Sequence, residues 1–152
     1  MSNIKNRKED GFTIIEVLIV LAIAGLIMLI VFLAVPALQR NSRNTQRKND
    51  AANYLSAVNE FMNNNNGKVP SAAADVTTIN SLAKLSTLTA PTAVSTGART
   101  GAVAVDAMEL VTGAKCDTTT VGNTATGSTR QFALRYGIED SGGNSVKQCI
   151  DS

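Results

Sequence analysis

A run of nineteen residues without a charged or strongly polar side chain constrains this chain more than any other feature. It covers residues 17–35 and reads VLIVLAIAGLIMLIVFLAV. A helix needs about twenty such residues to cross the hydrocarbon core of a bilayer. Apolar side chains surround this helix on every side, so it must lie in lipid or in the middle of a protein assembly. The sequence therefore predicts a membrane-spanning helix near the N-terminus.

Two simpler explanations of the apolar run account for less of the sequence. A cleaved secretory signal has a shorter apolar stretch, and no clean small-x-small cleavage site follows this one. A plain signal anchor explains the span and nothing else. Charge does not orient the span, because basic residues lie on both sides of it. They are Lys5, Arg7 and Lys8 before it, and Arg40, Arg43, Arg47 and Lys48 after it.

The upstream edge of the run carries a glycine, a phenylalanine and a lone carboxylate. Residues 8–17 read KEDGFTIIEV, which places Gly11, Phe12 and Glu16 at the start of the span. This arrangement resembles the processing site of type IV prepilins of the short-leader class and of the related pseudopilins. The resemblance implies that a membrane aspartic peptidase cuts between Gly11 and Phe12 and that the new amine of Phe12 is methylated. It covers roughly the first third of the chain.

Glu16 has a physical argument of its own. A carboxylate within a spanning segment costs about 2.5–3.5 kcal/mol on insertion scales, so it is usually functional and paired. After cleavage the amine of Phe12 is a cation, and it can pair with Glu16 of a neighbouring subunit and set the axial register. Alternatively, Thr13 and Glu16 fit the T-x-x-E capping box of a helix N-terminus. Both roles can coexist.

Two residues are expected to break the helix, Gly25 and Pro36. Proline at position 36 removes the hydrogen bond to the carbonyl of Phe32, which predicts a bend or a loosened turn there. Members of the resembled family commonly carry such helix breakers. A harmless kink near the membrane interface is the alternative.

Beyond the span the helix is predicted to continue to residue 63, where the run Asn63 to Gly67 ends it. The continuation is amphipathic. Its apolar stripe consists of Ala51, Leu55, Val58 and Met62, flanked by Tyr54 and Phe61.

Residues 64–152 are rich in Thr, Ser, Ala and Gly and are predicted to form an exported globular head. We expect a short helix at 79–85, strands at 102–111, 130–138 and 145–150, and turns over 86–101. The fold class is therefore α+β, with a long N-terminal helix packed on a small antiparallel sheet. The chain divides into a leader (1–11), a transmembrane or filament-core helix (12–38), its amphipathic continuation (39–63) and the head (64–152).

The two cysteines, Cys116 and Cys149, both fall in the head. They are too few for a zinc site, and they are either unpaired core residues or, in an exported domain, a disulfide. We predict the disulfide. The pair also resembles the cysteines that bound the C-terminal region of many pilins.

The chain has no histidine, which excludes histidine-based triads, histidine general bases and the commonest zinc ligand sets. It has no phosphate-cradling loop, and the carboxylates of the head show no recognisable catalytic spacing. We therefore expect no enzymatic activity, no metal and no cofactor. Arg40, Arg43 and Arg47 share a helical face, which is expected to be solvated or snorkelling; nucleic acid as a partner is left open.

The resemblance implies a structural subunit of a type IV pilus, or fimbrium, that polymerises through its apolar helix and serves cell adhesion, twitching motility or DNA uptake. The implied partners are other copies of the chain, a prepilin peptidase, a pilus assembly ATPase and membrane platform proteins. The prepilin would lie in the cytoplasmic membrane with its head outside, and the mature chain in an extracellular pilus. A pseudopilin of a type II secretion or competence apparatus is the alternative. A monomeric anchored binding or enzymatic domain would require an uncut N-terminus.

Overall fold

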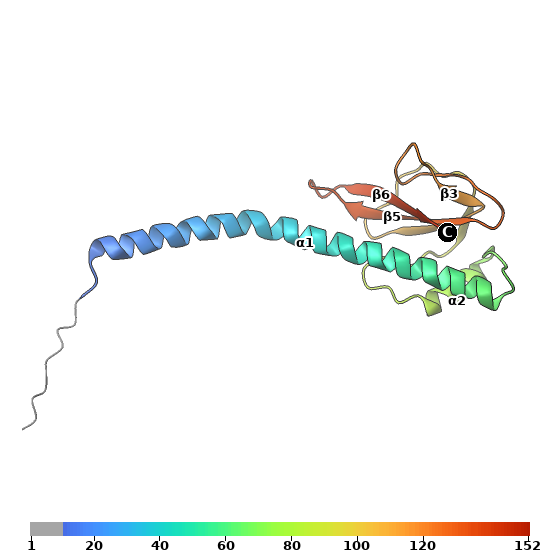
Figure 1. The fold of residues 1–152 in the computed structure, drawn as a ribbon, viewed down its shortest axis with the longest axis horizontal. Coiled ribbons are helices and arrows are strands. Elements are labelled where there is room, and N and C mark those ends of the chain that lie inside the picture. Colours follow the sequence, from blue (N-terminus) through green and yellow to red (C-terminus); the bar gives the residue numbers. More distant parts are fainter. Residues whose placement is uncertain (1–10) are drawn as a thin grey trace, which may run out of the picture. The chain divides into compact units, whose positions relative to one another are not determined.

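The structure is a computed structural model that describes residues 11–152, so residues 1–10 of the predicted leader lie outside the described part. The described residues divide into two compact units at Leu38 and Gln39 (Figure 1). The elements are the helices α1 (Ile14–Asn64) and α2 (Ala73–Leu82), and the strands β1 (Val94–Thr96), β2 (Met108–Thr112), β3 (Ala114–Cys116), β4 (Thr124–Thr126), β5 (Phe132–Glu139) and β6 (Ser145–Asp151).

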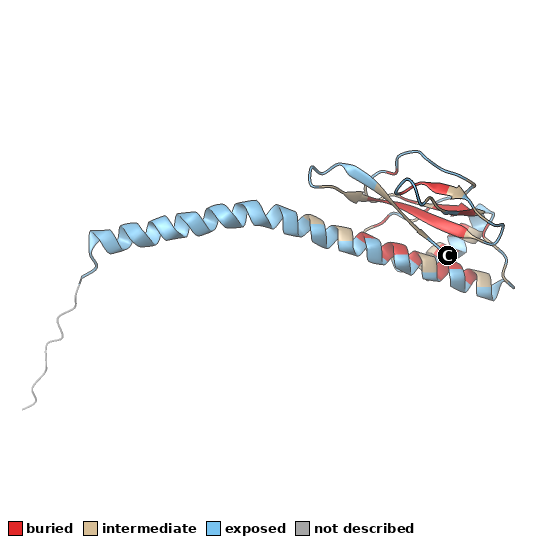
Figure 2. Ribbon diagram, turned by 45° about the horizontal axis from the view of Figure 1, so that its top comes forward, coloured by how far each residue is buried: buried red, intermediate tan, exposed pale blue. Residues whose placement is uncertain are grey.

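The first unit consists of residues 11–38 and contains the start of α1. Its side chains are all exposed (Figure 2), including Phe32 at 76% and Leu33 at 74%. Mean hydropathy reaches 3.3 over an 18-residue window of this helix, which is long and apolar enough to cross a membrane. An apolar helix with no buried face needs lipid or other protein around it, and this segment is suited to insertion into a membrane.

In the structure, α1 continues as one helix through Gly25 and Pro36, the two residues that were expected to interrupt it. A proline removes one backbone hydrogen bond, while the turns before and after it keep theirs. In an apolar segment every further unpaired backbone group costs several kcal/mol, which favours the continuous helix. Neither residue ends the helix, and the bend or loosened turn expected at Pro36 stays a prediction.

The second unit is a four-stranded sheet with the order β1-β2-β5-β6, covered on one face by α1. Strand β5 pairs antiparallel with β2 and β6, whereas β1 pairs parallel with β2. Alternate residues of β5 face α1, because side chains of a strand alternate between its two faces. The core between helix and sheet contains Ala51, Tyr54, Val58 and Phe61 of α1, Ile79 of α2, and Leu110, Phe132, Leu134 and Tyr136 of the sheet.

The α+β class is confirmed, with several differences in detail. Tyr54 and Phe61 lie at the centre of the buried helix face, and Leu55 and Met62 lie at its margin. The short helix is α2, which begins six positions earlier than predicted, at Ala73. Strand β1 occupies a stretch predicted as turns, and β3 and β4 form a separate two-stranded sheet that was not predicted. Three-residue strands are too short to leave an alternating pattern in the sequence.

Candidate processing and assembly site

The predicted cleavage point lies in irregular chain just before α1. Gly11, Phe12 and Thr13 precede the first helical residue, and Phe12 is 90% exposed. A Cβ atom added to Gly11 would meet nothing within 4 Å in the described part of the chain. The folded chain therefore makes no steric demand for glycine at this position.

Glu16 caps the start of α1. Its Oε2 accepts hydrogen bonds from the backbone N–H of Thr13 at 2.9 Å and from the Thr13 hydroxyl at 2.7 Å. The backbone N–H of Glu16 donates to the Thr13 hydroxyl in return, at 3.4 Å. This is the reciprocal geometry of a capping box. The carboxylate is exposed, and within residues 11–152 its other oxygen, Oε1, makes no hydrogen bond. Capping therefore leaves one oxygen available for a second partner.

A family model of the prokaryotic N-terminal methylation motif matches residues 6–32. The chain carries the signal motif of type IV pilins and pseudopilins. In this pilin-like chain the match contains Gly11, Phe12, Glu16 and Gly25 and ends before Pro36. The motif implies processing by a prepilin peptidase and assembly into a filament in general terms. No curated protein and no solved structure matches the chain.

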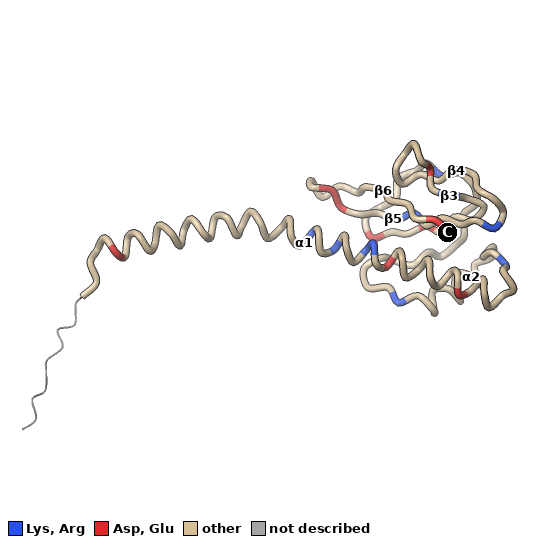
Figure 3. The backbone as a smooth tube through the Cα atoms, in the orientation of Figure 1, with Lys and Arg blue, Asp and Glu red and all other residues tan. Residues whose placement is uncertain are grey.

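Glu16 is also far in sequence from the other described charges. Within residues 11–38 it carries the sole charge, and the remaining described charges lie in the second unit (Figure 3). A single carboxylate on an apolar helix is costly to insert and costly to bury unpaired. The apolar part of this pilin-like helix thus carries a single charge, the Glu16 carboxylate, at the end where cleavage would create an amine.

The arginines after the span only partly match the solvated or snorkelling face that the sequence predicts, because Arg43 is exposed whereas Arg47 is buried. The Arg47 side chain is 1% exposed, and its guanidinium binds Asp106 at 2.6 Å and Glu139 at 2.7 Å. Arg43 binds the other oxygen of Glu139 at 2.7 Å, and Arg40 donates to the backbone oxygen of Ser141. These contacts join α1 to the end of β5 and the turn after it, so the arginines serve the fold of the head.

Hydrogen bonds from Arg43 and Arg47 lower the pKa of Glu139 to about 2. The carboxylate is therefore ionised at every ordinary pH. Since Asp106 and Glu139 neutralise much of the arginine charge, this face offers less attraction for nucleic acid or anionic lipid than the sequence suggests.

Asp50 is a second buried anchor on α1 that sequence reasoning missed. It is 2% exposed, and its Oδ2 accepts from the backbone N–H groups of Ser86, Thr87 and Leu88 at 3.0, 2.6 and 2.9 Å. Burial raises the pKa of Asp50, but these hydrogen bonds together outweigh burial and leave it lowered. A carboxylate in an apolar helical stripe was the available sequence signal, because such a group is rarely buried without partners.

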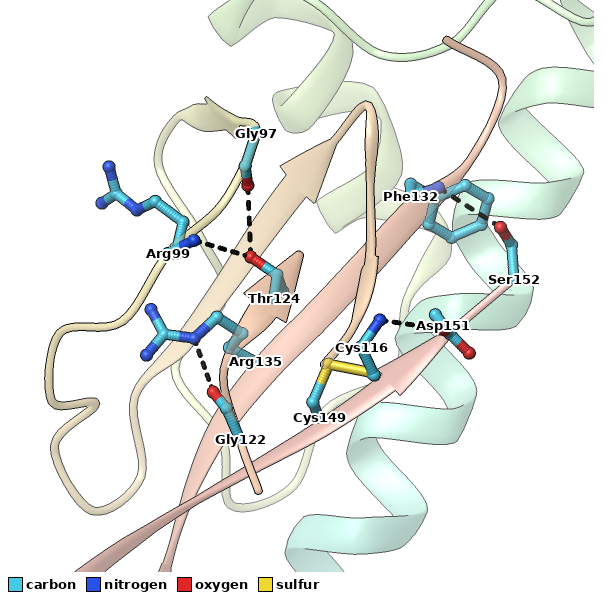
Figure 4. The surroundings of a disulfide bond; sticks show 10 residues. All are labelled: Gly97, Arg99, Cys116, Gly122, Thr124, Phe132, Arg135, Cys149, Asp151 and Ser152. Carbon is cyan, nitrogen blue, oxygen red and sulfur yellow. Dashed lines mark hydrogen bonds between the residues drawn. A yellow bond between two sulfur atoms is a disulfide. The ribbon is translucent and has the colours of Figure 1, made fainter. Parts of the chain in front are cut away.

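Arg135 is a third residue that the sequence reasoning missed. It is 1% exposed and projects from the face of β5 that points away from α1 (Figure 4). Its Nε donates to the backbone oxygen of Gly122 at 2.8 Å, Nη1 donates to Glu109 at 2.7 Å, and Nη2 donates to the backbone oxygen of Gly101. This one side chain holds two loops against the sheet.

The predicted disulfide is present and joins Cys116 of β3 to Cys149 of β6, with 5.7 Å between the Cα atoms (Figure 4). Next to it, the backbone N–H of Cys116 donates to Asp151 at 2.7 Å. Both cysteines pack against Val111, Ala114 and Ala133. The bridge therefore holds the small β3-β4 sheet against the main sheet.

Replacing both cysteines with serine is expected to lower the free energy of unfolding of the head by about 3–4 kcal/mol, because the bridge closes a loop across 33 positions. Urea unfolding of the full chain in detergent, followed by the near-ultraviolet circular dichroism of the tyrosines, measures this change. Both tyrosines, Tyr54 of α1 and Tyr136 of β5, are buried in the second unit, so the signal reports on the head and the part of α1 packed against it. Membrane insertion should be unchanged, and two free thiols in the native protein would contradict the bridge.

Proposed function

We propose that this chain is a structural subunit of a type IV pilus, cleaved after Gly11 and polymerised through the apolar part of α1. The role is architectural and not catalytic. The head, carried outside the cytoplasmic membrane before assembly, covers the surface of an extracellular filament that serves adhesion, motility or DNA uptake. Assembly requires a peptidase, an assembly ATPase and membrane platform proteins.

The observation that carries the proposal is the motif match at residues 6–32, which includes the start of a helix whose first half has no buried face. A membrane would cover that half before assembly, and other copies of the same helix would cover it afterwards. The steric freedom around Gly11 agrees with this role. Because no described residue needs glycine there, the requirement is expected to come from the peptidase that must fit its active site around the bond.

Cleavage gives the first test. We expect the mature protein to begin at an N-methylated Phe12, as measured by mass spectrometry of the N-terminal peptide from sheared surface material. Gly11→Leu should leave the leader attached, while the fold of the chain stays intact because the added side chain meets no described neighbour. Assembled protein that still begins at Met1 would exclude processing at this site.

The place where the filaments are found separates a pilin from a pseudopilin. Long surface filaments composed mainly of this chain would support a pilin. A mature chain that begins at Phe12 but stays in short fibres within the envelope would instead support a secretion or competence pseudopilin, with the same processing chemistry.

A further inference from the structure

One carboxylate of the second unit, Glu60 of α1, forms no ion pair and accepts no hydrogen bond within the described residues. The other aspartate and glutamate side chains of residues 11–152 each accept a hydrogen bond or form an ion pair; they are Glu16, Asp50, Asp75, Asp106, Glu109, Asp117, Glu139, Asp140 and Asp151. Glu60, on an exposed part of α1, makes neither kind of contact within these residues. In a head that satisfies its carboxylates so fully, Glu60 is available for a partner outside the chain.

Glu60 lies in a groove where α1 and α2 meet. The groove has a volume of about 260 Å³ and is lined by Asn53, Ser56, Ala57, Glu60, Leu82 and Lys84. Leu82 is 37% exposed, so the wall is partly apolar. Lys84 shares the groove without forming an ion pair with Glu60 in the described structure. A partner that enters this groove would displace water from the carboxylate, which strengthens its attraction for a cation.

A second hollow lies in the loop layer of the head and has an excess of positive charge. Its volume is about 390 Å³, and it is lined by residues 98–102, Glu109 and Arg135. Buried Arg135 is paired with Glu109, whereas Arg99 is exposed and its side chain makes no hydrogen bond within residues 11–152. The guanidinium groups of Arg99 and Arg135 point to the same side (Figure 4). The hollow therefore contains one carboxylate and two guanidinium groups, and of these two Arg99 is the one that forms no ion pair within residues 11–152.

The two hollows lie on opposite faces of the head. Leu134 and Tyr136 of β5 pack against α1, so Arg135 between them points to the other face, and Arg99 bridges to Thr124 of β4 in the layer beyond. The Glu60 groove lies on the helical side. A contact between patches on different faces of identical subunits is heterologous, and it continues from copy to copy if it does not close into a ring.

We infer that Glu60 of one copy enters the hollow beside Arg99 of the next copy and pairs with that arginine. The inference rests on the proposed function as a polymerising subunit. A guanidinium suits this contact because it can hold a carboxylate with two parallel hydrogen bonds. The excess positive charge of the Arg99 hollow attracts the carboxylate, and the second copy covers a groove that is open in the single chain.

Charge exchange tests the pair in the full chain. Arg99→Glu and Glu60→Arg should each lower the yield of sheared filaments about tenfold or more, because like charges are then placed opposite each other. The double variant restores an opposite pair and should return the yield to within about twofold of the unmodified chain. Arg130→Glu is the control: this exposed arginine lies outside both hollows, and its reversal should leave the yield unchanged.

Crosslinking provides a readout that does not need long filaments. Chains carrying Glu60→Cys and chains carrying Arg99→Cys, expressed together and treated with a short bifunctional maleimide, should form a dimer that neither variant forms alone. A normal filament yield from either single reversal, or no recovery in the double variant, would overturn the pair. If the unmodified chain forms no filaments, the proposed function fails, and the presence or absence of the dimer still decides the contact.

Discussion

Glu16→Leu is expected to be inserted into the membrane and cleaved at Gly11, yet to build few or no filaments on its own. Before cleavage the nitrogen of Phe12 is an uncharged amide, so Glu16 of a neighbouring subunit has no cation to meet. Processing creates that cation. Removing one partner of a buried ion pair typically costs about 3–5 kcal/mol, and each added subunit would lose such a pair. Leucine should ease insertion, because it removes a charge from the apolar segment.

Glu16→Gln separates pairing from capping. Glutamine can keep the capping-box hydrogen bonds to Thr13 but carries no charge. If Glu16 acts through charge, Glu16→Gln should fail to assemble, as Glu16→Leu does. Thr13→Ala removes the hydroxyl of the cap and keeps the charge, so it should still form filaments. The yield is measured by shearing and microscopy in cells without the unmodified protein. Normal filaments from Glu16→Gln would show that Glu16 is a helix cap alone.

The second large effect concerns stability. Arg47→Ala should lower the free energy of unfolding of the head by about 3 kcal/mol. That is the lower end of the range for breaking a buried ion pair, because Asp106 is half-exposed and remains partly solvated. Arg47 binds Asp106, Glu139 and Asn44 at once. Its loss leaves the Asp106 carboxylate without its ion-pair partner, whereas Glu139 keeps Arg43. Urea unfolding followed by the tyrosine signal measures the difference.

Arg43→Ala is the matched control for this prediction. Arg43 binds the same Glu139 carboxylate from a side chain that is 44% exposed, where solvent screens the interaction, so the loss should be much smaller. Measuring the free energy of unfolding at decreasing pH provides a second test. Because the pKa of Glu139 falls from 4.5 to about 2 on folding, its stabilising contribution is complete above pH 4.5 and disappears as the pH falls toward 2. Equal effects of the two substitutions would contradict the assigned role of Arg47.

Strand β5 shows which structural features the sequence pattern predicts and which it does not. Alternation of Phe132, Leu134 and Tyr136 correctly predicted a strand with one apolar face. It did not predict that Arg135, on the other face, is buried under two loops, because burial there depends on residues more than ten positions away. Strand β1 pairs with β2 through a similarly distant contact and leaves no local signal.

Sequence patterns were enough to predict the apolar spanning helix, the pilin-like signal motif around Gly11 and Glu16, the α+β class and the cysteine pair, because each depends on local order or on composition. The folded structure was needed to show that the arginines after the span hold the head to its helix. A basic helical face looks the same in sequence whether water or carboxylates surround it. Asp106 and Glu139 lie 59 and 92 positions from Arg47, and the folded sheet is what brings both of them to the guanidinium.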